Sequence, residues 1–254
     1  AVQDEGGARR IQWCLSYPSA FSRLDKRRLA SVWRSITEEL EPSTGVKHVC
    51  PGIQDLTHFR TESLAIAQYF ADKEDHNLVS STCVDLGGGT SDISIWERNT
   101  LIHQCSVQLA GRDLFSQFIS RKPDFILKHF EQDKSQWSEL EGPAFNAKLD
   151  VLLRNDSANW LRNKRSFVEE EPEFQGLLQL MALGFSGLYY YIGTLLGVLH
   201  QEGKYSDPQI TPVYIGGNGS QLLNWLAEDG RFDPDSEINA LLSKMLCEGS
   251  QFKD

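Results

Sequence analysis

Apolar residues recur along the chain with the spacing typical of strands in some segments and of helices in others. The apolar run Thr82–Leu86 predicts a strand, and Ser91–Trp96 predicts a second strand because Ile93 and Ile95 fall on one face and polar residues on the other. Three consecutive glycines join these strands. A third strand is predicted at Leu101–Gln108. The centre of the chain therefore predicts a glycine-turned hairpin that continues into a sheet.

Other patterned segments surround this hairpin. Gln221–Glu228 follows a strand and a double glycine within Val213–Ser220, and it is predicted to be helical. The remaining predicted elements are a strand at Ile11–Ser16, a helix at Asp25–Leu40 with Leu29, Val32, Trp33, Ile36 and Leu40 at helical spacing, a helix opening at Ala110–Phe115, a buried helix at Leu177–Leu199, and a short helical stretch within Phe232–Asp254.

The segment Val84–Ile95, VDLGGGTSDISI, carries the clearest chemistry. Glycines let backbone N–H groups approach a phosphate without obstruction by side chains. Asp85 ends the first strand, where a carboxylate can hold Mg²⁺ through water or orient an attacking water. The segment is no P-loop, because no Lys-Ser or Lys-Thr follows the glycines, and no dinucleotide fingerprint, because they open a strand. A ligand-free hairpin needs only one or two glycines, so the run favours phosphate binding.

The run DLGGGTSD resembles the second phosphate motif of the actin, Hsp70 and sugar-kinase superfamily, and its wording is closest to the Hsp70 form. Tyr17–Phe21 resembles the Val-Pro-Ala-type segment of that superfamily. Arg60–Tyr69 resembles its Glu-Pro-x-Ala-Ala-Ala-x-x-Tyr helix, with Glu62 at the acidic position and Ser63 in place of proline. Proline is favoured but not required at the start of a helix, so the match tolerates Ser63.

Two later segments extend the resemblance, which covers Ile11 to Glu228. Ala110–Phe115 resembles a Gly-Gly-x-x-Phe segment, with Ala110 where the first glycine often stands. Val213–Ser220 resembles the adenosine motif, in which glycines let the backbone pack against base and ribose. A helix N-terminus after that motif adds a favourable field for anions.

The resemblance implies an α/β protein with the ribonuclease H-like actin and Hsp70 ATPase fold, a mixed sheet flanked by helices with a helical second subdomain. It implies an ATPase that binds ATP or ADP with Mg²⁺ between two lobes and couples hydrolysis to movement. The implied catalytic residues are Asp85, Glu62 and Thr90, and Asp85 and Asp92 are the implied metal-binding residues. The implied nucleotide-binding residues are Gly87, Gly88, Gly89, Thr90, Gly111, Gly216, Gly217 and Asn218.

The middle of the chain is less informative. We divide the chain into a phosphate-binding portion at 1–120, a variable helical subdomain at 121–175, and a portion at 176–254 with the buried helix and adenosine motif. Arg162, Lys164 and Arg165 are candidates to cover the adenine, since Arg stacks on bases. A solvated basic face that balances the acidic run 169–171 is an equal alternative.

One departure from the superfamily is large. It begins with an Asp-x-Gly-Thr-like hairpin that grips the phosphates from the other lobe, and no such segment is found here. We therefore expect a fragment, or a protein lacking half of the site. Besides the ATPase, a sugar-type phosphotransferase and a degenerate scaffold that does not hydrolyse nucleotide stay open. The phosphotransferase needs a catalytic Asp, for which there is no distinct candidate.

Composition limits the classes of molecule that the protein is expected to bind. The chain has 254 residues, 40% of them hydrophobic and 24% charged, which is ordinary for a globular protein. Its net charge of −10 argues against nonspecific nucleic-acid binding. Leu177–Leu199 is long enough to span a bilayer, but its flanks are acidic and lack Lys and Arg anchors. We expect a cytoplasmic protein with a nucleotide ligand and a protein partner or self-association, but no membrane.

The cysteines and histidines predict no zinc site or disulfide framework. The five cysteines form no C-x-x-C pair, and the six histidines are scattered without ligand spacing. Cys14, Cys83 and Cys105 fall in predicted strands, where a free thiol packs as a small apolar group.

Overall fold

The computed structural model describes residues 10–74, 76, 78–111 and 171–252, together with separated residues between 113 and 155. Most of the predicted subdomain at 121–175 lies outside the described residues, as do Arg162, Lys164 and Arg165. Short helices are described there at α4 (Asp124–His129) and η1 (Lys134–Gln136). The three-part division of the chain stays a prediction.

A four-stranded mixed sheet forms the centre of the molecule. Its strands are β5 (Ser80–Leu86), β6 (Ser91–Glu97), β7 (Thr100–Val107) and β8 (Val213–Gly216). Their order is β7-β6-β5-β8; β5, β6 and β7 are antiparallel neighbours, whereas β8 runs parallel to β5. Three antiparallel strands with a parallel fourth beside the first are the ribonuclease H-like arrangement, so the predicted fold class is confirmed.

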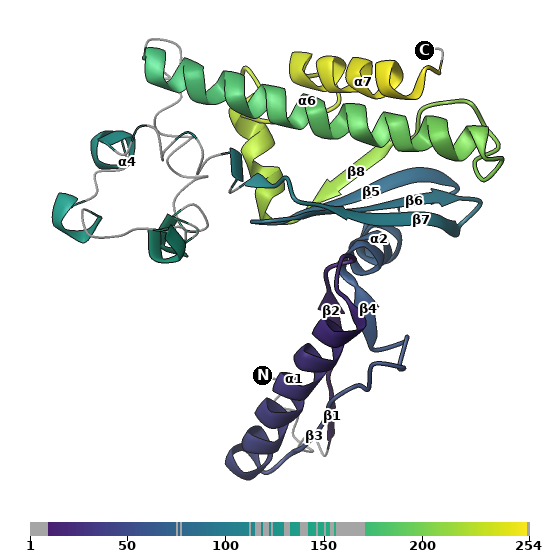
Figure 1. The fold of residues 1–254 in the computed structure, drawn as a ribbon, viewed down its shortest axis with the longest axis vertical. Helices are drawn as coiled ribbons and strands as arrows, with labels where there is room; N and C mark the ends of the chain where they lie inside the picture. The colour runs from purple at the N-terminus through teal and green to yellow at the C-terminus, as the bar shows by residue number, and fades with distance from the viewer. Residues whose placement is uncertain are drawn as a thin grey trace.

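Alternation along β5 and β6 gives the sheet two different faces. Val84 and Ile93 point to one face and join the main core with the long helix α6 (Pro172–Gln201). Cys83 points to the other face and packs against α2 (Glu62–Lys73). In Figure 1, α6 and α2 accordingly lie on opposite sides of the sheet. The predicted buried helix is thus confirmed as the helix that covers the sheet.

The helix α7 (Glu237–Ser250) stacks on α6 on the side away from the sheet (Figure 1). Glycines make this packing close. A Cβ on Gly193 would overlap the carbonyl oxygen of Leu246, and one on Gly249 would overlap the carbonyl oxygen of Tyr190. Helices approach this closely only where glycines remove the side chains between them.

Within the described residues, α6 alone is long and apolar enough to cross a membrane. The core helix of a globular domain meets the same criteria. Leu177, Leu188 and Ile192 of α6 are buried in the main core.

The N-terminal part projects from the sheet as a separate small layer (Figure 1). It contains β1 (Arg10–Gln12), β2 (Leu15–Tyr17), α1 (Arg23–Thr44), β3 (Lys47–Val49) and β4 (Phe59–Thr61). Parallel pairs form between β1 and β3 and between β2 and β4. A small core of Leu15, Tyr17, Ala30 and Phe59 joins these strands to α1.

The prediction of one strand at Ile11–Ser16 was wrong, because the chain changes partners in its middle. The N–H of Trp13 donates to the carbonyl of Val49 at 3.0 Å, whereas the N–H of Leu15 donates to the carbonyl of His58 at 2.7 Å. Cys14 therefore lies between β1 and β2, exposed, rather than packed in a strand.

Local signals explain why α1 is longer than predicted. Ser22 and Asp25 form a capping box at its start, and Gly45 ends it in the left-handed region at φ 67°. The spacing of its apolar residues predicted the helix correctly, but Val32 and Ile36 are exposed. Only part of that stripe packs against the small core.

The predicted helix at Gln221–Glu228 is a 3₁₀ helix, η2 (Asn218–Trp225), which begins directly after the double glycine. Its first residues, Asn-Gly-Ser, are poor α-helix formers. A 3₁₀ helix winds more tightly than an α-helix. The strand, the double glycine and a helical segment follow in the predicted order, but the helix begins at Asn218 and has 3₁₀ geometry.

Candidate functional site

Strand register brings the predicted metal-binding residues together. Asp85 lies opposite Asp92 across the antiparallel β5–β6 pair, and Asp85 is also the register partner of Gly216 in β8. Directly opposed residues of an antiparallel pair share a face. Both carboxylates therefore lie on the α2 face of the sheet, at the level where the glycine-rich adenosine segment begins.

Glu62 adds a third carboxylate at the start of α2. Thr61 caps this helix by accepting the N–H of Leu64, which places Glu62 in the first turn. Burial, and then the charges of Asp92 and Asp85, raise the pKa of Glu62 from 4.5 to about 7. Burial and the charge of Asp92 also raise the pKa of Asp85. The three carboxylates are thus close enough to repel one another in a partly dry site.

Hydrogen bonds hold the Asp92 carboxylate, which is 1% exposed. The backbone N–H of Ser19 donates to Oδ1 at 2.7 Å, and the hydroxyls of Thr90 and Ser106 donate to Oδ2 at 3.3 and 3.4 Å. These three donors hold the carboxylate in one orientation. Sequence reasoning placed Thr90 here but missed Ser19 and Ser106. The position of Ser19 beside Pro18, in the matched Tyr17–Phe21 segment, was the available signal.

The glycine hairpin departs in one respect from the predicted phosphate cradle. The N–H of Gly87 donates to the carbonyl of Thr90 at 2.9 Å, so this amide closes the hairpin and does not face a ligand. A Cβ on Gly87 would also lie 2.9 Å from that carbonyl oxygen. Gly88 is exposed at the tip, and Gly89 is half-buried beside it. The amide of Gly87 thus has a partner within the hairpin, and the phosphate-binding role predicted for Gly87, Gly88, Gly89 and Thr90 stays a prediction.

The adenosine segment packs directly on the end of β5. Gly217 has φ 83° and ψ 162°, a conformation almost restricted to glycine, and a Cβ on it would overlap Oδ1 of Asp85. A Cβ on Gly219 would lie 2.7 Å from the carbonyl oxygens of Leu86 and Gly87. Backbone geometry and packing therefore require these glycines, whatever else they contact. A larger residue at Gly217 would displace Asp85 as well as fill space.

Gly111 lies close to the same segment. It opens a helical stretch, and a Cβ on it would lie 2.6 Å from Cδ1 of Leu222 and 3.4 Å from Cα of Gly219. Asn218, the first residue of η2, directly follows Gly217. The structure therefore brings Gly111, Gly216, Gly217 and Asn218 to one end of the sheet, next to Asp85.

A polar clamp fixes the start of α2. Oε1 of Gln104 accepts the hydroxyl of Thr61 at 2.9 Å and that of Ser63 at 3.2 Å. The hydroxyl of Ser94 donates to the carbonyl of Ser63 at 3.2 Å, and the hydroxyls of Ser19 and Ser63 are 2.9 Å apart. These bonds hold the residues on both sides of Glu62. Ser63 stands where the superfamily has proline, so its hydroxyl is a local feature that the resemblance could not predict.

The carboxylates suit a magnesium ion held through water. Among the residues that the structure describes, no three His, Cys, Asp or Glu side chains gather closely enough to ligate a metal directly. Mg²⁺ usually keeps several waters and takes only one or two carboxylates. Burial and then the charge of Asp92 raise the pKa of Asp85, and a cation between the two carboxylates would relieve the repulsion. The donor set therefore fits the predicted ion.

The order and directions of the sheet, with the glycine hairpin at its end, define a domain of the ribonuclease H-like fold type. Among solved structures, similar chains include the ethanolamine utilization protein EutJ from Carboxydothermus hydrogenoformans, at 13% identity and TM-score 0.42, with 89% of this chain and 75% of that chain covered. Another is MreB 5 of Spiroplasma citri bound to AMPPNP, at 15% identity and TM-score 0.32, with 94% and 69% covered. No protein-family model and no curated protein matches the chain.

Proposed function

We propose that this chain is a nucleotide-binding domain that binds Mg-ATP beside the glycine hairpin and couples its hydrolysis to a conformational change. The observation that carries the proposal is the convergence of Asp85, Asp92 and Glu62 next to residues 88–90 and Gly217. Carboxylates whose pKa values are raised by burial and by neighbouring carboxylates, as those of Glu62 and Asp85 are, are a mark of functional sites. We further propose that the protein acts in the cytoplasm.

Each part of the site has a distinct role in this proposal. The amides of Gly88, Gly89 and Thr90 bind the phosphates, and Asp85 and Asp92 hold Mg²⁺ through its waters. When bound, the ion neutralises phosphate charge. The segment from Gly216 to Asn218, with Gly111 behind it, receives the nucleoside. Phosphoryl transfer depends mainly on positioning and charge, and these groups are already held in place by backbone packing.

Glu62 is the candidate proton acceptor. With a pKa of about 7, a substantial fraction of its carboxylate is ionised near neutral pH, and a general base works best when its pKa lies near the working pH. The clamp from Gln104 to Thr61 and Ser63 keeps the carboxylate at the first turn of α2. In the ionised form, an oxygen of Glu62 would orient a water and accept its proton.

Ser19 connects the carboxylates of the site to the N-terminal layer. This residue lies between β2 and α1, and its N–H binds the same carboxylate that is proposed to face the ion. Changes in charge at Asp92 would therefore change how strongly the N-terminal layer is held to the sheet. Such a contact suits a protein whose output is conformational.

Calorimetric titration of the chain with Mg-ATP tests the proposal. Gly88→Asp puts a negative charge at the exposed tip of the hairpin, and Gly88→Asn is the matched control with nearly the same shape and no charge. We expect saturable binding that Gly88→Asp weakens at least about tenfold more than Gly88→Asn, because like charges repel where phosphate binds. Equal affinities in the two variants would place the phosphates elsewhere and contradict the proposal.

Three further assays separate the cellular roles. ATP-dependent polymerisation would indicate an actin-like role, and turnover stimulated by an unfolded peptide would indicate an Hsp70-like one. Consumption of ATP only with added sugar would indicate a phosphotransferase. Binding without turnover under any of these conditions would indicate a scaffold that does not hydrolyse nucleotide.

A further inference from the structure

A hollow lies away from the three carboxylates. It has a volume of about 550 Å³ and lies between the β2–β4 pair and the outer side of α2. Cys14 and His58 both line it. They precede Leu15 and Phe59, which are register partners, and the N–H of Leu15 binds the carbonyl of His58 at 2.7 Å. Neighbouring strands lie about 4.8 Å apart, so the thiol and the imidazole belong to adjacent positions of the same wall.

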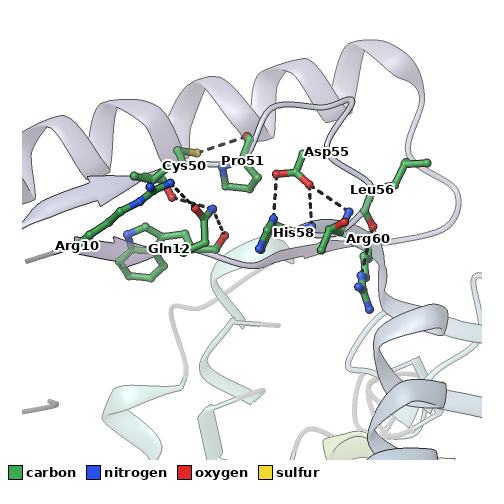
Figure 2. Close-up of polar contacts among 11 residues, drawn as sticks. Arg10, Gln12, Cys50, Pro51, Asp55, Leu56, His58 and Arg60 are labelled. Atoms are coloured by element: carbon green, nitrogen blue, oxygen red, sulfur yellow. Dashed lines mark hydrogen bonds and ion pairs between the residues drawn. The ribbon is translucent and has the colours of Figure 1, made fainter. Parts of the chain in front are cut away.

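A carboxylate orients the imidazole. Nδ1 of His58 lies 3.0 Å from Oδ2 of Asp55, and Oδ1 of Asp55 accepts the backbone N–H groups of Thr57 and His58 at 3.1 and 3.2 Å. Figure 2 shows these bonds converging on the Asp55 side chain. The hydrogen bond from His58 lowers the pKa of Asp55, so this group is a carboxylate at neutral pH. With Nδ1 engaged in this way, Nε2 is the nitrogen that can take a proton.

Cys14 differs from the other described cysteines in its surroundings. It is exposed, whereas Cys83 is buried in the sheet, where burial raises the pKa of its thiol to about 12. Burial also raises the pKa of Cys50 and Cys105. A reactive thiol needs access and a nearby base or positive charge; Cys14 is exposed and lines the same hollow as His58 and Arg60.

Two cationic side chains, Arg60 and Lys73, line the hollow together with one acidic side chain, Asp72. Arg60 lines it, with Nε bound to the carbonyl of Leu56 at 3.3 Å and the guanidinium held by Gln68 (Figure 2 shows the first contact). Lys73 lines the opposite wall on α2, next to Asp72, which binds Gln68 at 3.1 Å. Arg60 is thus fixed in orientation, as a group that recognises carboxylates should be.

We propose that Cys14, with His58 and Asp55, is a thiol-exchange site for small disulfides that carry carboxylates. His58 Nε2 accepts the proton of the Cys14 thiol, and the thiolate attacks one sulfur of the disulfide. A new disulfide forms to Cys14, the original one breaks, and the other half leaves as a thiolate that takes the proton from His58. The Cys14 sulfur is oxidised and the departing sulfur is reduced, so no other reactant is needed.

The test incubates the whole chain with glutathione disulfide and follows the adduct by intact mass and peptide mapping. We expect modification at Cys14 before any other cysteine, and none at that peptide in Cys14→Ser. We expect His58→Gln to slow the reaction about tenfold, because less thiolate forms. Adduct formation at Cys50 as fast as at Cys14, or an unchanged rate in His58→Gln, would overturn the proposal.

Two comparisons separate chemistry from folding and from charge. In urea, the chain and His58→Gln should react at equal rates, so a difference that persists there would overturn the role of His58. For each disulfide, the rate in the native state is divided by its rate in urea. This ratio should be several-fold larger for the anionic glutathione disulfide than for the cationic cystamine. Arg60→Gln should reduce the difference between the two ratios. Equal relative rates for the two disulfides would overturn the anion-binding part of the proposal. Binding of Mg-ATP is not involved in any of these readouts.

Discussion

Asp85 and Asp92 face each other directly across the β5–β6 pair. Like charges opposed in this way destabilise a sheet by about 0.2–1 kcal/mol. The rest of the hairpin follows the local rules, with apolar residues on the core face and glycines at the turn. An isolated violation of such rules is typical of a functional site, and here it identifies the place where a cation would be most favourable.

Replacing Asp85 separates stability from function. Asp85→Asn keeps the shape of the side chain and removes the repulsion with Asp92, so we expect the free energy of unfolding to rise by about 0.5 kcal/mol. We also expect Mg²⁺-dependent ATP binding and any turnover to be lost. Urea unfolding and calorimetry measure the two effects. A variant that is less stable yet still binds Mg-ATP would contradict both assignments.

Glu62 should make stability depend on pH. Because its pKa is raised from 4.5 to about 7 in the folded state, the folded protein keeps a proton that the unfolded chain releases. Stability contributed by that proton is present below pH 4.5 and is lost as the pH rises toward about 7. The raised pKa of Asp85 acts in the same direction. Glu62→Gln should therefore flatten the plot of urea midpoint against pH in this window, and an unchanged slope would count against the assignment.

Gly217 is expected to be a structural requirement in its own right. Gly217→Ala forces a Cβ toward Oδ1 of Asp85 in a region of backbone conformation that costs other residues about 1–3 kcal/mol. Gly203 is a matched control, because it has φ 69° and nothing within 4 Å of an added Cβ. We expect Gly217→Ala to lower the free energy of unfolding more than Gly203→Ala does. Equal losses of unfolding free energy would show that Asp85 and the loop around Gly217 move aside at little cost.

Two glycines of α6 should respond oppositely to the same change. A Cβ on Gly193 would overlap the Leu246 carbonyl and lie 2.9 Å from the N atom of Ser250, whereas one on Gly187 has nothing within 4 Å. We expect Gly193→Ala to destabilise the protein by separating α6 from α7. Gly187→Ala should stabilise it by up to about 1 kcal/mol, since alanine favours helix. Thermal unfolding of both variants would decide, and an unchanged or raised Tm in Gly193→Ala would contradict the close α6–α7 packing.

The central sheet could be predicted from the sequence because its signals are local. Alternation in Ser91–Trp96 and the glycine run predicted the hairpin, and a strand was predicted where β8 lies, but its parallel pairing with β5 was not predicted. The break in the first strand could not be predicted, because the N–H groups of Trp13 and Leu15 bind carbonyls of two different segments that lie far along the chain. Hydrophobic period alone does not determine which strand pairs with which.

The carboxylates of the site were predictable, but their support was not. Asp85, Asp92 and Glu62 were identified from residue type and motif position. Their hydrogen-bond partners come from other segments, as with Gln104, which reaches Thr61 and Ser63 from β7. The amide of Gly87 was assigned to a ligand because sequence cannot show that Thr90 already accepts it.

The parallel pairing of β5 with β8 has a consequence for how the protein folds. The hairpin of β5 and β6 is local, whereas β8 can join only after the chain has closed a loop that contains α6 and the whole middle region. Loops of this length close late, because entropy must be lost before the distant contact forms. The proposed nucleotide site, which lies at this junction between Asp85 and Gly216, is therefore expected to be among the last parts to form. A chain interrupted before residue 213 would keep its glycine hairpin and lack the segment proposed to receive the nucleoside.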